Sequence, residues 1–443
     1  MCISHATADG LARLMHEAVE PKSNIMKKIY ILPLLALTSI SSYGQGQIKK
    51  YVESNTIPIN SIQPDFADYT DLEQIGKAVG DARIVMLGEQ GHGDGAAFLA
   101  KTRLVKYLHE QKGFNVIAFE GDFFGLNAGW DEIPKEKEQI SKFLYDNLYT
   151  IWTRSKQCSD LLYDYIPSTY QTNTPLQVTG FDNKVYLDHS PRYLKTYIDT
   201  YLRQTDIPFV NTKAYQEEFL PAVEGLTKGW LIGKDTELRS LEDQAGLIIH
   251  QLEEHRNQYG WLLLKNIQTF AAVTRTARNQ REANETRDRQ MAENLEWLLR
   301  EKFPNEKVIV WAANAHISKN ATTAFKFEKS RLNWMGTVFA SDSLNEASTY
   351  VLGLASRSGF HQNVLQPAPS KVNSPQKKGF ENWIDKVHQY AFVDFKRFRK
   401  DNPTYSDYFL MKGFGHNNDL ADWTQVFDGI FFISEMTPSE KMN

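Results

Sequence analysis

Short apolar runs followed by polar residues recur along the chain and predict buried strands. Four of these runs cover residues 84–87, 116–119, 176–181 and 308–311, and each ends in polar or ionisable side chains. The runs are continuous rather than alternating, which is typical of strands covered on both faces in a parallel sheet. A fifth apolar run, residues 429–434, predicts a late strand near the end of the chain.

Helical periodicity separates the predicted strands. Leu99, Leu104, Val105 and Leu108 recur at helical spacing within residues 98–111, and Gly113 follows as a stop signal. A strand, a helix and a second strand in this order form a βαβ unit. The sequence therefore predicts an α/β fold with a mainly parallel sheet.

The middle and late parts of the chain have a different pattern. The stretch of about residues 190–300 is long, charged and helical in period, and we interpret it as a helical insertion packed over the sheet. Residues 360–380 are rich in Pro, Ser, Lys and Gln, which predicts a surface loop.

The N-terminal region is typical of a bacterial export signal. Met26 is followed by two lysines, an apolar run over residues 29–40 and small residues, which predicts a signal peptide over residues 26–45. We interpret residues 1–25 as an upstream, non-native start and residues 46–443 as the α/β domain. The apolar run is too short to span a bilayer, so we expect an exported, periplasmic or secreted protein without stable membrane insertion after cleavage.

Composition narrows the class of partner. The net charge of −4 lacks the basic excess that binding to nucleic acid requires, so we expect no nucleic-acid partner. Aromatic residues make up 12% of the chain, which suits a pocket for a bulky small molecule. The two cysteines, Cys2 and Cys158, imply no disulfide framework. The sequence leaves the oligomeric state open.

The strongest chemical signal is a set of ionisable residues at the ends of the four predicted strands. In open parallel sheets, ligands bind in the crevice outside the carboxyl ends of the strands. The sequence predicts a functional cleft at that edge, formed by Glu89, His92, Glu120, Asp182 and His316.

His92 is the candidate general base. A neutral imidazole can take a proton from water, and a carboxylate on its second nitrogen would hold the tautomer and stabilise the imidazolium. Glu89 precedes His92 by three residues, and we expect Glu120 on the neighbouring strand. We also expect the N-terminus of the following helix to offer free N–H groups to an oxyanion. In the alternative interpretation, His92 only caps this helix and Glu120 forms a local ion pair.

Three other chemistries are weaker. The chain has no Gly-x-Ser-x-Gly elbow and no His-Glu-x-x-His motif. His250 and His255 are five residues apart, so their rings would diverge on a helix. Residues 91–96 fit the dinucleotide pattern Gly-x-Gly-x-x-Ala, but Glu89 and Asp94 would place negative charge where a pyrophosphate must bind.

Ordered motifs over residues 65–436 resemble the erythromycin esterase family, which includes proteins labelled succinoglycan-biosynthesis-like. The opening motif Gly-Glu-x-x-His is Gly88–His92, followed by an apolar helix and then by a strand ending in Glu120. The further matches are Trp152, Gly180-Phe181-Asp182, Arg287-Asp288-x-x-Met291-Ala292, Asn314-x-His316, Met335-Gly336 and Phe431-Phe432-Ile433.

The resemblance implies an α/β/α sandwich with a helical lobe and the hydrolysis of macrolide lactone esters. It implies that His92 activates water beside Glu89 and Glu120. Lys101 falls where the family often has a basic residue pointing into the cleft. We therefore expect the substrate to be bound by Lys101, Asp182, Arg287 and His316.

Departures from the family pattern concern the outer cleft. Ala313 replaces the first histidine of a His-Asn-x-His motif, and Val338-Phe339 replaces a His-Leu pair. These changes favour the same chemistry on a different ester. The family is generally regarded as working without a cofactor, and we expect none. A divalent ion bound by His92, Glu89, Glu120 and His316 stays open, because neutral histidine and carboxylates are competent zinc ligands.

The sequence as a whole predicts a carboxylic ester hydrolase acting through water activated by His92, with a small-molecule ester as its substrate. A macrolide lactone is one candidate, which would make the protein an antibiotic-resistance enzyme. The alternative is a non-catalytic periplasmic protein of the same fold that keeps the cleft for binding a ligand.

Overall fold

The computed structural model describes residues 38–442 and is built on a nine-stranded mixed sheet, with a separate two-stranded hairpin. The strands of the main sheet are β1 (Ile57–Ile59), β2 (Ile84–Leu87), β3 (Phe114–Asp122), β4 (Gln177–Asp182), β5 (Lys307–Trp311), β6 (Thr349–His361), β7 (Ser370–Lys371), β8 (Tyr390–Asp394) and β11 (Gly429–Met436). The hairpin pairs β9 (Phe409–Met411) with β10 (Asp419–Ala421). All five apolar runs are confirmed as strands.

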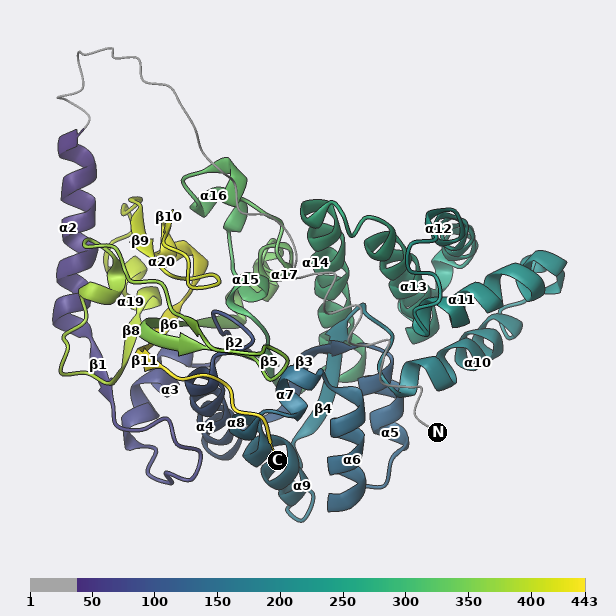
Figure 1. The fold of residues 1–443 in the computed structure, drawn as a ribbon, viewed down its shortest axis with the longest axis horizontal. Helices are drawn as coiled ribbons and strands as arrows, with labels where there is room; N and C mark the ends of the chain where they lie inside the picture. The colour runs from purple at the N-terminus through teal and green to yellow at the C-terminus, as the bar shows by residue number, and fades with distance from the viewer. Residues whose placement is uncertain (1–37, 443) are drawn as a thin grey trace, which may run out of the picture.

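The central strands run parallel in the order β11-β6-β2-β5-β3-β4, while β8 and β1 pair antiparallel at one edge. The prediction of a mainly parallel sheet is confirmed. The expectation that Glu120 lies on the strand next to that of Glu89 is wrong, because β5 lies between β2 and β3 (Figure 1). The βαβ unit therefore skips one place in the sheet, which a distant segment of the chain fills.

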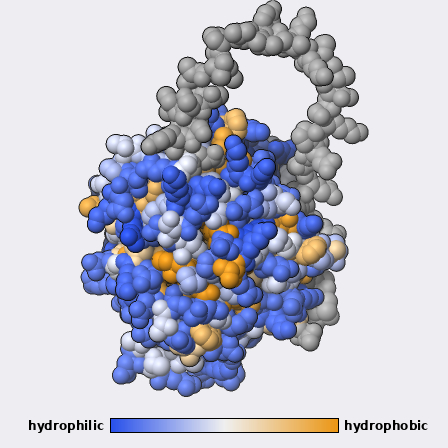
Figure 2. Space-filling model, turned by 90° about the vertical axis from the view of Figure 1, so that its left-hand side faces the viewer, coloured by the Kyte–Doolittle hydropathy of each residue, from blue (hydrophilic) through white to orange (hydrophobic). Residues whose placement is uncertain are grey.

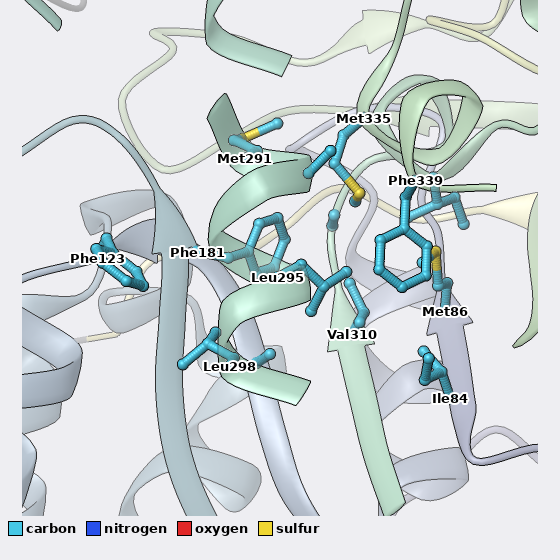
Figure 3. Packing of buried hydrophobic residues seen from close by; sticks show 14 of the residues in the cluster. Ile84, Met86, Phe123, Phe181, Met291, Leu295, Leu298, Val310, Met335 and Phe339 are labelled. Carbon is cyan, nitrogen blue, oxygen red and sulfur yellow. The ribbon is translucent and has the colours of Figure 1, made fainter. Parts of the chain in front are cut away.

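Both faces of the sheet are buried in hydrophobic cores, as the continuous apolar runs predict. Along β2, Ile84 and Met86 face one core, whereas Val85 and Leu87 face the other. Helix α14 (Gln280–Trp297) covers the first face, and its residue Leu295 lies next to Val310 of β5 (Figure 3). The short helix α17 (Met335–Phe339) packs on the same face with Met335 and Phe339. Helix α4 (Gly95–Lys112) covers the opposite face, which makes the fold an α/β/α sandwich.

Helix α4 (Gly95–Lys112) follows β2 directly and positions the turn that carries His92. Phe98, Leu104 and Leu108 are buried in the second core. Gly113 ends the helix with a φ of 71°, a left-handed conformation that glycine adopts without strain, so the predicted stop is confirmed.

The chain between β4 and β5 is helical in the described structure. Its longer helices are α10 (His189–Arg203), α11 (Leu220–Thr227), α12 (Asp235–Gln251), α13 (Tyr259–Arg275) and α14. Figure 1 shows α10 to α13 gathered to one side of the sheet, while α14 runs back against it. This arrangement corresponds to the helical lobe that the sequence predicts.

Strands β6 and β8 were not predicted. Residues 350–355 are apolar enough for a strand but contain Gly353, and β8 is only five residues long. β6 also reaches His361, into the predicted loop, and β7 is a two-residue strand within that loop. Hydrophobic periodicity alone identifies such short or interrupted runs poorly.

The N-terminal predictions fall mostly outside the described residues. The upstream segment 1–25 and most of the signal peptide 26–45 precede helix α2 (Thr38–Asn55). Over residues 38–442, the helices include none with both the length and the apolarity that a bilayer crossing demands. The face of the molecule seen in Figure 2 is largely hydrophilic, with small and separate hydrophobic groups.

Candidate active site

The register of the parallel strands brings the predicted site residues to one edge of the sheet. Leu87 pairs with Trp311, and Trp311 pairs with Phe119. Glu89 and Glu120 therefore follow the same row of paired residues, on either side of β5. Asp182 ends β4, the next strand along. The predicted convergence of these carboxylates at the carboxyl ends of the strands is confirmed.

His92 and Glu89 form a direct contact. The Nδ1 atom of His92 lies 3.1 Å from Oε1 of Glu89, whose side chain is fully buried, whereas 36% of the His92 side chain is exposed. The edge of the Trp152 ring faces the imidazole at 5.9 Å between centroids. A carboxylate can only accept a hydrogen bond, so Nδ1 of His92 carries the proton and Nε2 of the neutral ring is free to act as a base.

Lys101 contacts Glu89 in the interior of the protein. Its side chain is fully buried, and Nζ forms an ion pair with Oε2 of Glu89 and lies 3.2 Å from the carbonyl oxygen of Ala312. Nζ also lies 4.0 Å from the centroid of the Trp311 ring. Burial lowers the pKa of Lys101, and the charge of Glu89 opposes that effect. The structure thus places Lys101 against Glu89 and away from solvent, which differs from the expectation that it points into the cleft to bind substrate.

Glu120 belongs to a second, more deeply buried group. It is 2% exposed, and its Oε1 accepts a 2.7 Å hydrogen bond from Nη2 of Arg287. Its Oε2 accepts a 3.2 Å hydrogen bond from the backbone N–H of Ala313. Burial alone would raise the pKa of Glu120, but the charges of His316, Arg287 and His92 hold it well below its usual range. Glu120 is therefore ionised at neutral pH.

Arg287 also holds Asp182 in a two-point ion pair. Nε and Nη2 of Arg287 lie 2.9 and 2.7 Å from the two carboxylate oxygens of Asp182, a geometry that matches the planar guanidinium. The hydroxyl of Tyr149 donates a further 2.8 Å hydrogen bond to Asp182. Burial acts to raise the pKa of Asp182, and the adjacent Arg287 lowers it below the ordinary value.

His316 completes this group, which we call the Arg287 network: Glu120, Asp182, Arg287, Asp288 and His316. Nδ1 of His316 lies 2.6 Å from Oδ1 of Asp288, and Nε2 lies 3.3 Å from Oε1 of Glu120. Burial lowers the pKa of His316, but the charges of Asp288 and Glu120 outweigh it and leave the pKa raised. The network therefore combines three carboxylates with one guanidinium and one imidazole.

The His92–Glu89 pair and the Arg287 network are joined through the segment after β5. Ala313 N–H donates to Glu120, and Asn314 N–H donates to the backbone oxygen of Glu89 at 2.8 Å. The charge of His92 acts on Glu120, but in the described structure Glu120 has no direct hydrogen bond to the imidazole. Of the two predicted glutamates, Glu89 is the one that orients the ring.

The turn between β2 and α4 depends on a close backbone approach at Gly88. A Cβ atom at this position would lie 1.9 Å from Oδ1 of Asn314. The side chain of Asn314 is itself fixed, because Nδ2 donates to the backbone oxygens of Leu354 and Gly413 at 2.7 Å each. Only glycine fits at residue 88, which explains the first position of the Gly-Glu-x-x-His motif.

The expected oxyanion site at the N-terminus of α4 is wrong. The first N–H of the helix, that of Gly95, donates to the carbonyl oxygen of Thr437 at 2.8 Å. A Cβ on Gly95 would lie 2.4 Å from the carbonyl oxygen of Pro438, so the C-terminal segment covers the helix end. The same contact leaves no space for a pyrophosphate, which argues against the dinucleotide interpretation. The N-cap position is Asp94 and not His92, so the interpretation of His92 as a cap is also wrong.

A second edge of the sheet offers a cavity without this chemistry. A space of about 400 Å³ is lined by Asn115, Gln177 and Glu306, which lie near the amino ends of β3, β4 and β5. It contains none of the residues predicted for the site and lies at the opposite strand ends, so we do not assign it to the reaction.

Comparison with known proteins assigns the chain to a family. Residues 109–435 match the family model described as erythromycin esterase. The chain belongs to the erythromycin esterase family. One family relative, "Putative hydrolase YbfO" of Bacillus subtilis (strain 168), is 24% identical over 94% of this chain and 99% of its own length. Another, "Erythromycin esterase type II" of Escherichia coli, is 24% identical over 89% of this chain and 99% of its own length.

The fold is also shared with a solved structure of this family. A mutant of the erythromycin esterase EreC, solved in its open conformation, superposes with a TM-score of 0.63, at 17% identity over 86% of this chain and 97% of that chain. The names of the matched family and relatives support a hydrolase.

The structure shows where the residues lie that depart from the expected erythromycin esterase pattern. Ala313, where a histidine was expected, uses its backbone N–H to bind Glu120 and presents only a methyl group from its side chain. Val338 and Phe339 lie in α17, and Phe339 is buried in the core. A methyl group therefore stands near Glu120 where the family motif has an imidazole.

The sequence analysis missed three contributors to the site. Tyr149 and Asp288 bond members of the Arg287 network, and Trp152 packs on His92. Asp288 and Trp152 stood within matched motifs but carried no expected role, and only packing reveals Tyr149.

Metal binding by the predicted residues conflicts with their contacts. Glu120 and His316 are tied to Arg287 and Asp288, and Glu89 is paired with Lys101. Within residues 38–442, the side chains that converge closely enough to share a cation are instead Asp94, His361 and His416.

Proposed function

We propose that the protein is a carboxylic ester hydrolase in which His92 activates water as a general base. The observation that carries this proposal is the His92–Glu89 contact at 3.1 Å on a ring that remains 36% exposed. The buried carboxylate fixes the tautomer, and the exposed side of the ring is open to water and substrate. A carboxylate–imidazole pair of this kind is the orienting half of a catalytic triad.

The reaction needs no covalent enzyme intermediate. Nε2 of His92 takes a proton from water while the water oxygen attacks the carbonyl carbon of the ester. The tetrahedral intermediate then breaks its bond to the alkoxy oxygen, and the His92 imidazolium returns the proton to this leaving group. The products are a carboxylic acid and an alcohol, and the imidazole is neutral again.

Lys101 acts as a positioning residue in this proposal. It has no exposed surface and contacts Glu89, so it acts on the reaction through the carboxylate. Its ammonium is the ion-pair partner that balances the Glu89 carboxylate in a buried place. Glu89 accepts from Nδ1 of His92, which leaves Nε2 as the nitrogen that can take up a proton.

Glu120 supplies the second negative charge near His92. Arg287 and His316 hold Glu120 ionised, and His92 is among the charges that lower its pKa. Glu120 is thus a fixed negative charge near the imidazolium that forms when His92 accepts the proton of water. The Arg287 network thus keeps a buried anion in place beside the reacting centre, with Asp182 and His316 in supporting positions.

The substrate we propose is an uncharged or weakly charged ester of a bulky alcohol or lactone. One relative is named an erythromycin esterase, which makes a macrolide lactone one candidate and antibiotic resistance a consequence if it is hydrolysed. The exchange to Ala313 changes the cleft beside Glu120, which favours a different ester. We further propose that the protein is exported, because of the signal-like sequence over residues 26–45.

The test is turnover of an aryl ester panel and of erythromycin by the purified chain. His92→Ala should lower kcat by about 10²–10⁴-fold, the usual contribution of a general base. Glu89→Gln should lower kcat in the same range, because Nδ1 of His92 loses its charged partner. Glu120→Ala should also lower kcat. A matched control is His250→Ala, an exposed histidine on α12 that should leave the rate unchanged.

Two results would overturn the proposal. If His92→Ala and wild type hydrolyse every active ester at the same rate, His92 is not the base. If wild type turns over none of the esters but a panel member stabilises it against heat, the cleft serves binding, and the non-catalytic alternative holds.

A further inference from the structure

A second constellation lies next to the proposed catalytic turn and takes no part in the reaction above. Asp94 stands at the N-cap of α4, His361 ends β6, and His416 lies in the loop between β9 and β10. One ligand atom from each of these residues lies within 4.8 Å of the other two. Asp94 is 0% and His416 is 2% exposed, while His361 is partly exposed. Three segments far apart in sequence therefore converge on one point.

Polar neighbours surround the buried ring of His416. Nε2 of Gln90 donates to the backbone oxygen of Lys412, so Oε1 of Gln90 is an acceptor. The hydroxyl of Ser356 donates to this Oε1 at 2.7 Å. The same Ser356 oxygen lies 3.5 Å from Nδ1 of His416, at the outer limit of hydrogen-bond distance.

His416 and Asp94 are in direct contact. Nε2 of His416 lies 2.9 Å from Oδ1 of Asp94. Both side chains are withdrawn from solvent, Asp94 at 0% and His416 at 2% exposure. A buried imidazole beside a carboxylate oxygen offers two of the ligand types that zinc sites use.

His361 supplies the third possible ligand of the cluster. The rings of His361 and His416 lie 4.8 Å apart between centroids at an angle of 42°. A metal ion would use both rings as ligands together with the carboxylate of Asp94. The ligand atoms of tetrahedral zinc lie about 3.3 Å apart, because each is about 2.0–2.2 Å from the ion. The three ligand atoms here lie within 4.8 Å of one another, and the partly exposed His361 is the ligand that has room to move closer.

Asp94 is already oriented for such a role. It occupies the N-cap of α4, yet its side chain makes no capping hydrogen bond to the helix. Instead, Oδ2 accepts a 2.9 Å hydrogen bond from the N–H of Gly91, and Oδ1 faces His416. The loop of His416 is held in place as well, because Gly415 N–H donates to the backbone oxygen of Gln90 at 2.9 Å.

We propose that Asp94, His361 and His416 form a binding site for one divalent transition-metal ion, with Zn²⁺ as the ion that best fits the ligands. Two imidazoles and one carboxylate are a common zinc ligand set, with water in the fourth position. Ser356 is the polar group beside Nδ1 of His416, the place where zinc proteins have an outer hydrogen-bond partner. The ion would link three segments: the turn that carries His92, the end of β6 and the loop between β9 and β10.

Metal content and affinity of the full chain test this proposal without reference to hydrolysis. The protein is stripped with a chelator, dialysed against Zn²⁺ and then against buffer, and its metal is measured by mass spectrometry. Wild type should retain one zinc ion per chain. Titration with Co²⁺ should produce the visible absorption of a tetrahedral site, and Zn²⁺ should raise the Tm of the stripped protein.

Three single variants should lose these signals. They are His361→Gln, Asp94→Asn and His416→Asn, where asparagine tolerates the positive φ of 59° at residue 416. Loss of an outer partner alone weakens metal sites by about 10–100-fold, so loss of a ligand should weaken binding by at least that factor. His250→Ala, which removes an exposed histidine, should bind zinc as wild type does.

The informative comparison uses His361→Gln, because its partly exposed position makes misfolding of this variant the smallest concern. If this variant has the Tm of stripped wild type and no longer responds to Zn²⁺, the site is confirmed. If wild type retains no ion, or if His361→Gln binds Zn²⁺ with wild-type affinity, the proposal is overturned, and the Asp94–His416 contact is an ordinary ion pair.

Discussion

Arg287 offers the sharpest test of how the site is held together. Its guanidinium is the direct cationic partner of two buried carboxylates, Glu120 at 2.7 Å and Asp182 at 2.7 and 2.9 Å. Both carboxylates are at most 2% exposed. Replacement by leucine keeps much of the side-chain volume but removes the charge and every hydrogen bond from the side chain of residue 287. Two buried anions then lose their direct hydrogen-bonded cation, and only the charges of Lys184, His92 and His316 still act on them.

The expected loss of unfolding free energy is about 3–5 kcal/mol at pH 7, the usual effect of removing one partner from a buried ion pair. The pH dependence of this loss of unfolding free energy tests whether the buried charges cause it. In wild type, the pKa values of Glu120 and Asp182 lie below their unfolded values of about 4, so their stabilisation is present above that pH and is lost as the pH falls through the folded values. The gap between wild type and Arg287→Leu should therefore be widest near neutral pH and narrow toward pH 4.

Urea unfolding followed by circular dichroism, at several pH values, measures this gap. The triple variant with Glu120→Gln and Asp182→Asn added to Arg287→Leu is the matched control. It removes the two carboxylates that the leucine variant leaves without their cationic partner. This variant should recover part of the lost free energy. A loss below about 1 kcal/mol at pH 7, or a gap that does not change with pH, would refute the account of Arg287 as the cation of a buried network.

Three further predictions concern the turn and its supports. Gly88→Ala should cost at least about 1–3 kcal/mol, because its Cβ would overlap Asn314, and an unchanged urea midpoint would contradict that close approach. Lys101→Met should lower kcat with little change in KM, since the buried amine contacts Glu89 and not substrate; a raised KM alone would instead support the expected substrate contact. Deleting residues 437–443 should lower the Tm by exposing the N-terminus of α4, and an unchanged Tm would show that this cover contributes nothing.

The local hydrophobic pattern was sufficient to predict much of the sheet and which residues follow the carboxyl ends of its strands. The five apolar runs became strands because a continuous apolar segment can be buried only where both faces are covered. The residues just after these strands could be placed together, because the carboxyl ends of parallel strands share an edge. Glu89 and His92 lie three residues apart in one turn, so their contact was predictable from sequence.

Strand order was beyond the reach of the sequence. The prediction that Glu120 neighbours β2 failed because β5, nearly two hundred residues further along the chain, pairs between β2 and β3. A run of apolar residues predicts that the segment is buried, but it does not predict which other strand will lie beside it. The central strand β6 was missed for a related reason, since its apolar part is interrupted by Gly353.

The partners of the buried charges were decided by tertiary structure alone. Lys101 was expected to point into the cleft, yet α4 packs so that its amine reaches Glu89 in the interior. Arg287 and Asp182 are 105 residues apart and meet because α14 packs back onto the sheet. Asp94 and His416, 322 residues apart, meet at the other side of the same turn. The sequence by itself determined which segments are buried and which residues can carry chemistry, because both follow from local composition and period. Which charge faces which depends on helix packing and strand register over long separations, and only the folded chain sets those.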